Sequence, residues 1–220
     1  MTERAESAPG VGVRERKKRE TRLAIHQAAM ELFATRGFDQ VSVAQVAEAA
    51  HVSKVTVFNY FPTKEDLVMV PLAERVADPG RPVRERAPGQ SAVGALRREF
   101  LADLDRRAAH VGLDPGGLGL MRVVRGSAAL TGRALLLERR NERRLAETLA
   151  AETGAAADDI TSLVVAATVM AAMRAVVAEN WRRLVEGDDE DAVHADAVAD
   201  AERAFAILEE GLGAYAVRKR

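Results

Sequence analysis

Apolar residues recur along most of the chain at spacings of three and four, which is the period of an amphipathic helix. The first such stretch predicts a helix over residues 14–36, and Gly37 stands where a left-handed C-terminal cap belongs. Residues 1–13 are rich in glycine, proline and polar residues and are predicted to be a disordered tail. The inner face of the helix is formed by Ile25, Ala28, Ala29, Leu32 and Phe33.

Two short helices are predicted next. Ser42, with a glutamine three residues later, has the pattern of a capping box, so a helix over 43–50 should begin here. Ser53 is again a favourable N-cap residue, and Pro62 should end the helix that follows it, 53–61.

Residues 55–58 read Val-Thr-Val-Phe, which propensity alone would assign to a strand. The end signals, together with Val57 and Phe61 at i, i+4 spacing, favour a helix, because tertiary packing overrides propensity. Two short helices separated by a tight turn and preceded by a long helix predict a helix-turn-helix over residues 14–62.

The rest of the chain is predicted to be helical as well, so the fold class is all-α. A connecting helix, 63–76, begins at Thr63, and a stretch rich in proline and glycine, 77–90, is predicted to be a linker. Residues 91–220 should form a larger helical domain with helices at 91–110, 118–125, 127–152, 158–186 and 191–213.

The last two of these helices have broad apolar faces and are joined by a short acidic turn, which predicts an αα-hairpin. Two such hairpins from two copies of the chain would make a four-helix bundle, and hence a homodimer. The alternative is that the hairpin packs only within its own domain.

Composition supports a soluble helical protein. Of 220 residues, 48% are hydrophobic but only 4% aromatic, which suits helices packed through alanine and leucine. The absence of cysteine excludes disulfides and thiol chemistry and is compatible with a cytoplasmic protein. We find no run of 18 apolar residues and no secretory signal at the N-terminus, so no membrane association is expected.

Charge is distributed unevenly. Residues 1–64 hold 10 Lys and Arg against 7 Asp and Glu, whereas residues 65–220 hold 22 against 26. The basic excess is concentrated at residues 14–22, and such a local field attracts a polyanion even when the whole chain is nearly neutral. A solvated helix start is the alternative interpretation.

The second short helix carries side chains that suit DNA on the side opposite Val57 and Phe61. Lys54 and Lys64 can neutralise phosphates, and Thr56 and Asn59 can hydrogen-bond base edges or phosphates. Val55 and Phe58 can contact thymine methyl groups or sugars, and Tyr60 offers a hydroxyl group. The alternative is an ordinary helical hairpin whose outer face is polar.

Residues 28–68, AAMELFATRGFDQVSVAQVAEAAHVSKVTVFNYFPTKEDLV, closely resemble the DNA-binding domain of the TetR family of bacterial transcriptional regulators. The resemblance implies an all-α homodimer with an N-terminal three-helix DNA-binding domain and a C-terminal domain, 91–220, that binds a small-molecule effector and dimerises. By family pattern, the DNA contacts fall on Ser42, Ser53, Lys54, Val55, Thr56, Phe58, Asn59, Tyr60 and Lys64. A basic arm that reaches phosphates or the minor groove would be formed by Arg14, Arg16, Lys17, Lys18 and Arg19.

Three positions depart from the family pattern. His51 stands in the turn where glycine is common, and a positive φ there would cost histidine some energy. Val55 stands where glycine is frequent and Phe58 where tyrosine is frequent. These changes concern the operator sequence and not the mode of binding.

The C-terminal half, from RRNERRLAETLAAETG to AFAILEEGL, is similar to the actinobacterial branch typified by the mycofactocin-system regulator, which implies an acyl-CoA-type ligand. An apolar pocket is expected from Phe100, Leu104, Leu120, Met121, Val124, Met170, Met173 and Trp181, although these residues could equally form the domain core. The arginines of 139–144 could meet an anionic ligand group, or pair with neighbouring glutamates as a solvated face.

An enzyme is the rival class. The four histidines are scattered, and the chain has no HExxH motif, no Gly-Lys-Ser/Thr phosphate loop and no calcium-loop spacing. We therefore expect no catalytic residues, no metal and no cofactor. The sequence predicts a ligand-responsive repressor released from a palindromic operator by a small apolar or acyl-type ligand. The alternatives are an activator of the same fold and an all-α enzyme.

Overall fold

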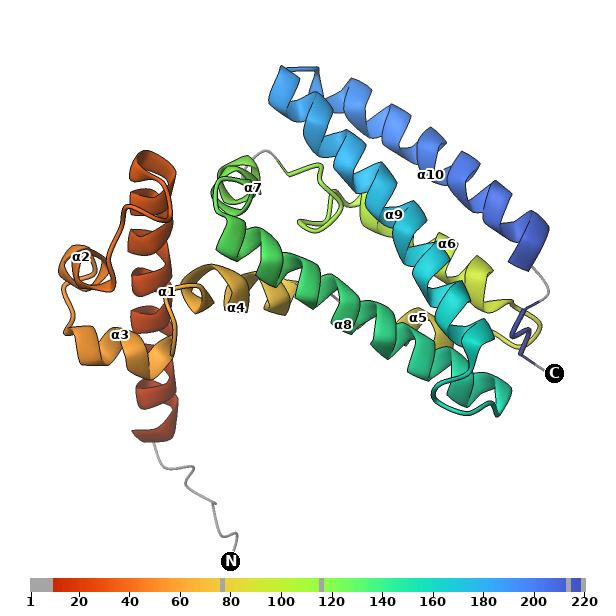
Figure 1. The fold of residues 1–220 in the computed structure, drawn as a ribbon, viewed down its shortest axis with the longest axis horizontal. Coiled ribbons are helices and arrows are strands. Elements are labelled where there is room, and N and C mark those ends of the chain that lie inside the picture. Colours follow the sequence, from red (N-terminus) through yellow and green to blue (C-terminus); the bar gives the residue numbers. More distant parts are fainter. Residues whose placement is uncertain (1–9, 76–77, 115–116, 213–214, 219–220) are drawn as a thin grey trace, which may run out of the picture. The chain divides into compact units, whose positions relative to one another are not determined.

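The computed structural model describes residues 10–75, 78–114, 117–212 and 215–218, and all regular secondary structure in these ranges is helical (Figure 1). This confirms the all-α prediction. The chain divides into two compact units. Unit 1 comprises the chain up to Pro71 together with Arg122–Thr131, and unit 2 comprises Leu72–Met121 and Gly132–Arg220. The helices are α1 (Gly10–Arg36), α2 (Val43–Ala49), α3 (Lys54–Tyr60), α4 (Asp66–Arg75), α5 (Arg81–Arg84), α6 (Ala92–Asp105), α7 (Gly117–Arg125), α8 (Ala128–Thr153), α9 (Ile160–Glu186) and α10 (Glu190–Leu212).

Unit 1 is built around a small closed core. Phe33, near the end of α1, packs against Phe38 with ring centroids 5.0 Å apart. Gly37 between them has a φ of 82°, the left-handed conformation that lets the chain reverse at the helix end. The other fully buried residues of this core include Ile25, Ala29, Val41, Val46, Val57, Phe61, Leu67 and Val68.

The helical assignment of the Val-Thr-Val-Phe run is confirmed. Ser53 caps α3, since its Oγ accepts a hydrogen bond from the backbone N–H of Thr56 at 3.0 Å. Val57 and Phe61 are buried, and Pro62 follows the C-cap residue. Caps and two anchoring side chains therefore outweigh the β propensity of the segment.

The first helix begins earlier than the sequence predicts. Residues 10–13 form the first turn of α1, so they are not part of a disordered tail, and residues 1–9 lie outside the described residues. Glycine and proline content suggested an irregular segment here. The helix nevertheless continues back to Gly10 and includes the whole predicted basic arm.

Unit 2 is organised by α9 and α10, which form the expected αα-hairpin and pack together with α6. Phe100 of α6 and Phe205 of α10 meet in its core with ring centroids 6.1 Å apart. Asp159 caps α9 by accepting from the N–H of Ser162, and Gly187 ends it with a φ of 90°. The final residue of the predicted helix 191–213 lies outside the described residues.

Residues of the predicted linker, 77–90, are integrated into unit 2. They contain α5, and Val83 and Arg86 are both buried. The Arg86 guanidinium donates to Glu152 at 2.6 Å and to the carbonyl of Ala216 at 2.9 Å. The segment rich in proline and glycine is therefore packed in unit 2 and does not act as a linker there. Ala77 and Val76, the last residue of the predicted connecting helix, lie outside the described residues.

The glycine-rich loop before α7 accommodates Trp181. A Cβ atom at Gly117 would lie 2.6 Å from the indole ring, and one at Gly112 would lie 3.1 Å from it. Trp181 is buried against Gly112 and Gly117, so the missing side chains of these two glycines leave room for its indole ring.

Within the described ranges, one helix, α9, is long and apolar enough to cross a membrane by length and composition. This is weak evidence for a membrane span, because the core helix of a soluble protein passes the same test. Val165, Ala166 and Val169 of α9 are buried in the core shared with α6 and α10.

Candidate nucleic-acid interface and ligand cavity

The turn between α2 and α3 is fixed by backbone hydrogen bonds. His51 has a φ of 52°, which is the positive conformation that costs histidine some energy. The N–H of His51 donates to the carbonyl of Glu48 at 3.1 Å, and the N–H of Val52 donates to that of Ala47 at 2.9 Å. This pair of bonds is the Schellman arrangement, which closes the end of α2 and sets the direction in which α3 leaves it.

Helix α2 begins with the capping box that the sequence indicates. Ser42 Oγ accepts from the N–H of Gln45, and Gln45 Oε1 accepts from the N–H of Ser42 at 2.8 Å. Thr63 and Asp66 cap the start of α4 reciprocally, at 2.9 and 3.2 Å. The helix-turn-helix is thus held by local bonds at each end of its short helices.

Four side chains of α3 are exposed: Lys54, Val55, Phe58 and Asn59. Their positions, i, i+1, i+4 and i+5, put them on one face of the helix, which we call the α3 face. Val55 is 69% exposed and Phe58 is 43% exposed, although both are large hydrophobic residues. The α3 face is therefore half apolar and half able to make hydrogen bonds.

Outside the basic arm, four of the other five predicted DNA contacts have partners within the protein. The Ser42 and Ser53 hydroxyls serve as caps, and the Thr56 hydroxyl lies 2.8 Å from that of Ser53. Lys64 is half-buried, with its ammonium group 4.2 Å from the centre of the Phe38 ring. Tyr60 is also half-buried. None of these five residues is among the four that form the α3 face.

The five residues of the predicted basic arm are all exposed on the first turns of α1. Arg16 forms an ion pair with Glu20 at 3.6 Å, one turn further along α1. The arm is therefore helical, and its exposed cations are distributed around α1.

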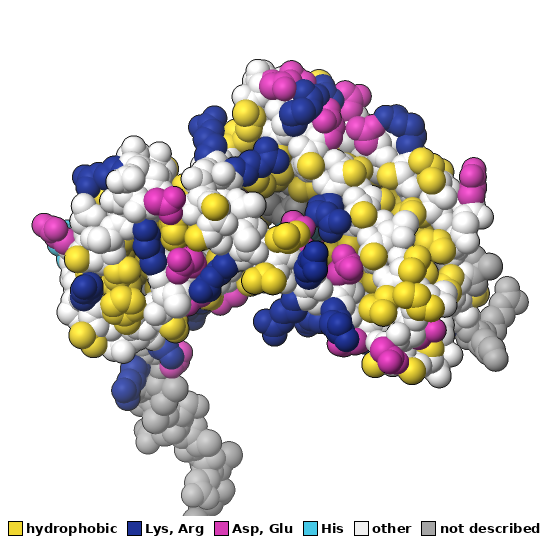
Figure 2. Space-filling view, viewed as in Figure 1, with side chains coloured by type: hydrophobic (Ala, Val, Ile, Leu, Met, Phe, Trp, Pro, Cys, Tyr) yellow, Lys and Arg dark blue, Asp and Glu magenta, His cyan; other side chains and the backbone are white. Residues whose placement is uncertain are grey.

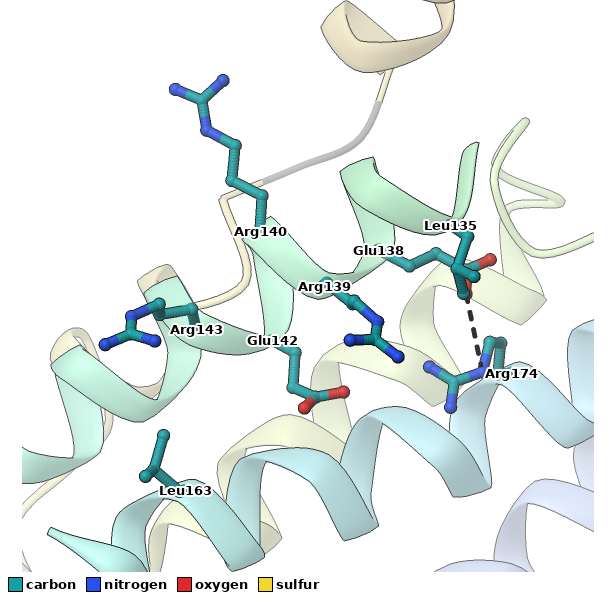
Figure 3. A pocket seen from close by; sticks show the side chains of 8 residues that line it. All are labelled: Leu135, Glu138, Arg139, Arg140, Glu142, Arg143, Leu163 and Arg174. Carbon is teal, nitrogen blue, oxygen red and sulfur yellow. Dashed lines mark ion pairs between the residues drawn. The ribbon is translucent and has the colours of Figure 1, made fainter. Parts of the chain in front are cut away.

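An open cavity of about 760 Å³ lies in unit 2 between α8 and α9 (Figure 3). Its lining is mostly charged: Leu135, Glu138, Arg139, Arg140, Glu142, Arg143, Leu163 and Arg174. In Figure 3, Arg139 and Glu142 project from α8 towards α9, whereas the side chain of Arg140 points away from α9. Leu135 and Leu163 supply apolar surface on the two helices.

The charges of this cavity are only partly paired. Arg174 of α9 meets Glu138 of α8 at 3.7 Å, and Arg143 meets Glu147 at 3.8 Å. Arg139 forms no ion pair within the part of the chain that the structure describes. The sequence had singled out the arginines of 139–144, but Arg174 and the two leucines carry no local signal that marks them as neighbours of this cluster.

The eight residues predicted to form an apolar pocket are not brought together around this cavity, and none of them lines it. Phe100 and Leu104 are buried in the core of unit 2, and the indole ring of Trp181 packs against Gly112 and Gly117. Val124 is buried in unit 1, whereas Leu120, Met121, Met170 and Met173 are partly buried residues of unit 2. Helical periodicity had identified buried and partly buried faces, and their use as a ligand pocket stays a prediction.

No group of three or more His, Asp or Glu side chains that could hold a metal ion occurs in the ranges that the structure covers.

Comparison with known proteins identifies the family. Residues 25–69 match the sequence model of the bacterial regulatory proteins of the tetR family. The chain is also 31% identical over 175 residues to the HTH-type transcriptional regulator TcmR of Streptomyces glaucescens, an alignment that covers 78% of this chain and 77% of TcmR. The chain belongs to the TetR family. Its fold, with an N-terminal helix-turn-helix and a helical C-terminal domain, is that of this family of transcription regulators.

Solved structures of TetR-type proteins share the fold. NalD of Pseudomonas aeruginosa, the secondary repressor of the MexAB-OprM multidrug efflux pump, superposes with a TM-score of 0.58 at 18% identity, covering 85% of this chain and 97% of NalD. FadR of Thermus thermophilus, a transcriptional repressor solved in complex with lauroyl-CoA, superposes with a TM-score of 0.50 at 25% identity, covering 87% and 94%. The relatives compared are regulators.

Proposed function

We propose that this TetR-family protein is a homodimeric repressor that binds a palindromic operator and leaves it when a small acyl-type ligand binds unit 2. The observation that carries the DNA-binding part is the α3 face. A rigidly capped helix presents Lys54, Val55, Phe58 and Asn59 to solvent, on the second helix of a helix-turn-helix. In this motif the second helix enters the major groove.

The charges around the α3 face support the same role. Lys54 lies at the start of α3, and the basic arm adds five exposed cations on α1. Phosphate contacts from such residues supply affinity, whereas Asn59 and the apolar pair supply contacts with base edges. Affinity for the operator should therefore fall steeply as salt rises.

The test is a double substitution on the α3 face. Lys54→Ala with Asn59→Ala removes one phosphate contact and one base contact in each half-site, so operator affinity should fall by at least about 100-fold. Operators are obtained by selection from random duplexes with the full-length protein, and affinity is measured by fluorescence anisotropy. The matched control, Gln27→Ala with Arg36→Ala, removes an exposed amide and an exposed cation from α1. Unchanged affinity in the α3 variant would refute the site.

Dimerisation is proposed through the exposed face of the αα-hairpin. Ile160 and Val164 of α9 and Ile207 of α10 are large hydrophobic residues exposed to solvent. Figure 2 shows hydrophobic side chains spread over the face of unit 2 that carries these helices. A second hairpin would cover them and complete a four-helix bundle.

The effector is proposed to bind in the cavity between α8 and α9. Leu135 and Leu163 can contact an acyl chain, and Arg139 can pair with an acidic group, since it has no ion pair among the described residues. The related FadR was solved with lauroyl-CoA, which combines these two chemistries. An amphipathic acyl ligand fits this lining better than a wholly apolar one, because an apolar ligand would desolvate the arginines without pairing them.

Helix α8 offers a route from the cavity to unit 1. Its first residues belong to unit 1 and the later ones line the cavity, with no break in the helix. Ser127, just before α8, is buried and donates to Asp39 Oδ1 at 3.2 Å within unit 1. The ligand must bind the DNA-incompetent state more tightly, so that it shifts the population away from the operator-bound state.

The effector part is tested with lauroyl-CoA and, for comparison, coenzyme A alone. Lauroyl-CoA should release the wild-type protein from its operator, and Arg139→Ala should raise the concentration needed by about tenfold, the loss expected for a charged hydrogen bond. The control is Arg133→Ala, which removes an exposed arginine of α8 that lies outside the cavity lining. If lauroyl-CoA releases both variants at the same concentration, or releases none of the proteins, the cavity is not the effector site.

As a DNA-binding regulator of this kind the protein acts in the cytoplasm, independently of membranes, and uses no cofactor or catalytic residue. Its relatives are transcriptional regulators.

A further inference from the structure

The composition of the α3 face raises a question that phosphate binding does not answer. Val55 is 69% exposed and adds little to the core of unit 1, and Phe58, at 43% exposed, leaves a large part of its ring in solvent. The buried side of α3 is already supplied by Val57, with Phe61 at its end. The solvent-exposed parts of these two side chains add nothing to folding, and a partner at this face would bury them together.

We infer that each operator half-site presents the 5-methyl group of a thymine to Val55, and that this contact is what selects the base at that position. This inference rests on the proposed DNA-binding function and names what the α3 face reads. Phe58 lies one turn further along the same face and extends the apolar strip towards the neighbouring base or sugar.

The chemistry of the major groove leaves one apolar group for Val55 to contact. Every base pair presents hydrogen-bond donors and acceptors there, and only thymine adds a methyl group. Valine cannot form a hydrogen bond. Opposite a guanine or cytosine edge, valine would displace water from polar atoms of the base without offering them a hydrogen bond, which costs free energy. Opposite a thymine methyl, the same side chain gains by burying apolar surface.

The position of Val55 favours this contact over one with the backbone. Lys54, the adjacent residue, supplies the charged group that suits a phosphate, and Asn59 supplies the amide that suits an adenine edge. Val55 lies between these in the register of the α3 face, in the first turn after the Ser53 cap. The apolar contact thus falls among the base contacts of the helix.

The experiment compares thymine with uracil, which differ by that methyl group alone. Operators are selected from random duplexes with full-length protein, and each thymine of the half-site is then replaced by deoxyuridine in both half-sites. We expect one position at which wild-type affinity falls by about fourfold per half-site, the value of one buried methyl-sized group. In Val55→Ala this preference for thymine over uracil should disappear at that position and persist elsewhere.

Alanine is a safe replacement, because Val55 is exposed and alanine has the higher helix propensity. The control is Leu23→Ala, which removes an exposed hydrophobic residue from α1 and should keep the wild-type preference. The inference is overturned if no thymine shows a methyl effect, or if Val55→Ala retains it, while selection still yields a defined operator. Failure to select any sequence would instead overturn the proposed DNA-binding function, and this inference with it.

Discussion

The α3 face of unit 1 and the cavity of unit 2 are both candidate binding surfaces, but they arise in different ways. On α3, the hydroxyls are committed to caps and the inner side chains to the core, which leaves Lys54, Val55, Phe58 and Asn59 on the outside. In unit 2, most of the apolar residues that looked suitable for a ligand are packed against one another. The cavity is lined instead by charged residues of two helices.

This difference shows where function can be recognised from local pattern. A short capped helix has few side chains, and those not needed for folding are evident. A long helix in a larger core offers many apolar residues, and burying most of them is what stabilises the unit. The three substitutions below test that contrast, in order of decreasing effect.

The first substitution asks whether Phe100 is core or pocket. Because Phe100 is buried against Phe205, Phe100→Ala should lower the free energy of unfolding by about 3–5 kcal/mol, measured by urea denaturation. Leu135 lies in the cavity lining and is half exposed. Leu135→Ala should therefore change the free energy of unfolding by less than about 0.5 kcal/mol and instead lower the affinity for lauroyl-CoA. A stable Phe100→Ala protein with weakened ligand binding would restore the apolar pocket that the sequence suggests.

The second substitution concerns the exposed apolar face of the hairpin. Val164→Glu with Ile207→Glu should raise the dimer dissociation constant by at least about 100-fold, or about 2.7 kcal/mol, because it buries unpaired carboxylates at the proposed interface. Sedimentation velocity measures this, and circular dichroism confirms that the helices persist. Leu136→Glu, an equally exposed position on α8, is the matched control and should remain dimeric. A double variant that stays dimeric would rule out this face as the interface.

The third substitution concerns the turn before α3. His51 has a φ of 52°, a conformation that glycine adopts without strain, so His51→Gly should stabilise unit 1 by about 0.5–1 kcal/mol in thermal unfolding. Glu48→Gly, within the adjacent helix, should lower stability by about 1 kcal/mol and serves as the control. If His51→Gly were neutral or destabilising, histidine would be making a contact that compensates for its backbone conformation.

Much of the fold follows from local signals in the sequence. Ser42 and Ser53 mark the starts of α2 and α3, and Gly37 and Gly187 mark the ends of α1 and α9, because caps are set by neighbouring residues. The αα-hairpin follows in the same way from its two apolar faces and its short turn. The integration of residues 81–86 into unit 2 does not, since Arg86 depends on Glu152 and Ala216, which are remote in sequence.

Of the two candidate sites, one follows from local sequence pattern and the other depends on tertiary packing. Exposure of Val55 and Phe58 follows from the period of one helix anchored by Val57, so the α3 face was predictable. The cavity depends on how α8 lies beside α9, and the meeting of Glu138 with Arg174 has no trace in local pattern. Sequence periodicity identifies which residues are buried, but not where packing leaves a space.

The central claim is that the α3 face is the surface that contacts the operator. Hydrogen–deuterium exchange of the full-length protein, with and without its selected operator duplex, tests this most directly. We predict that exchange slows in the segment 53–61 and in the first turns of α1, while α6 in the core of unit 2 is unchanged. Protection confined to unit 2, with the segment 53–61 exchanging at its free rate, would contradict the account.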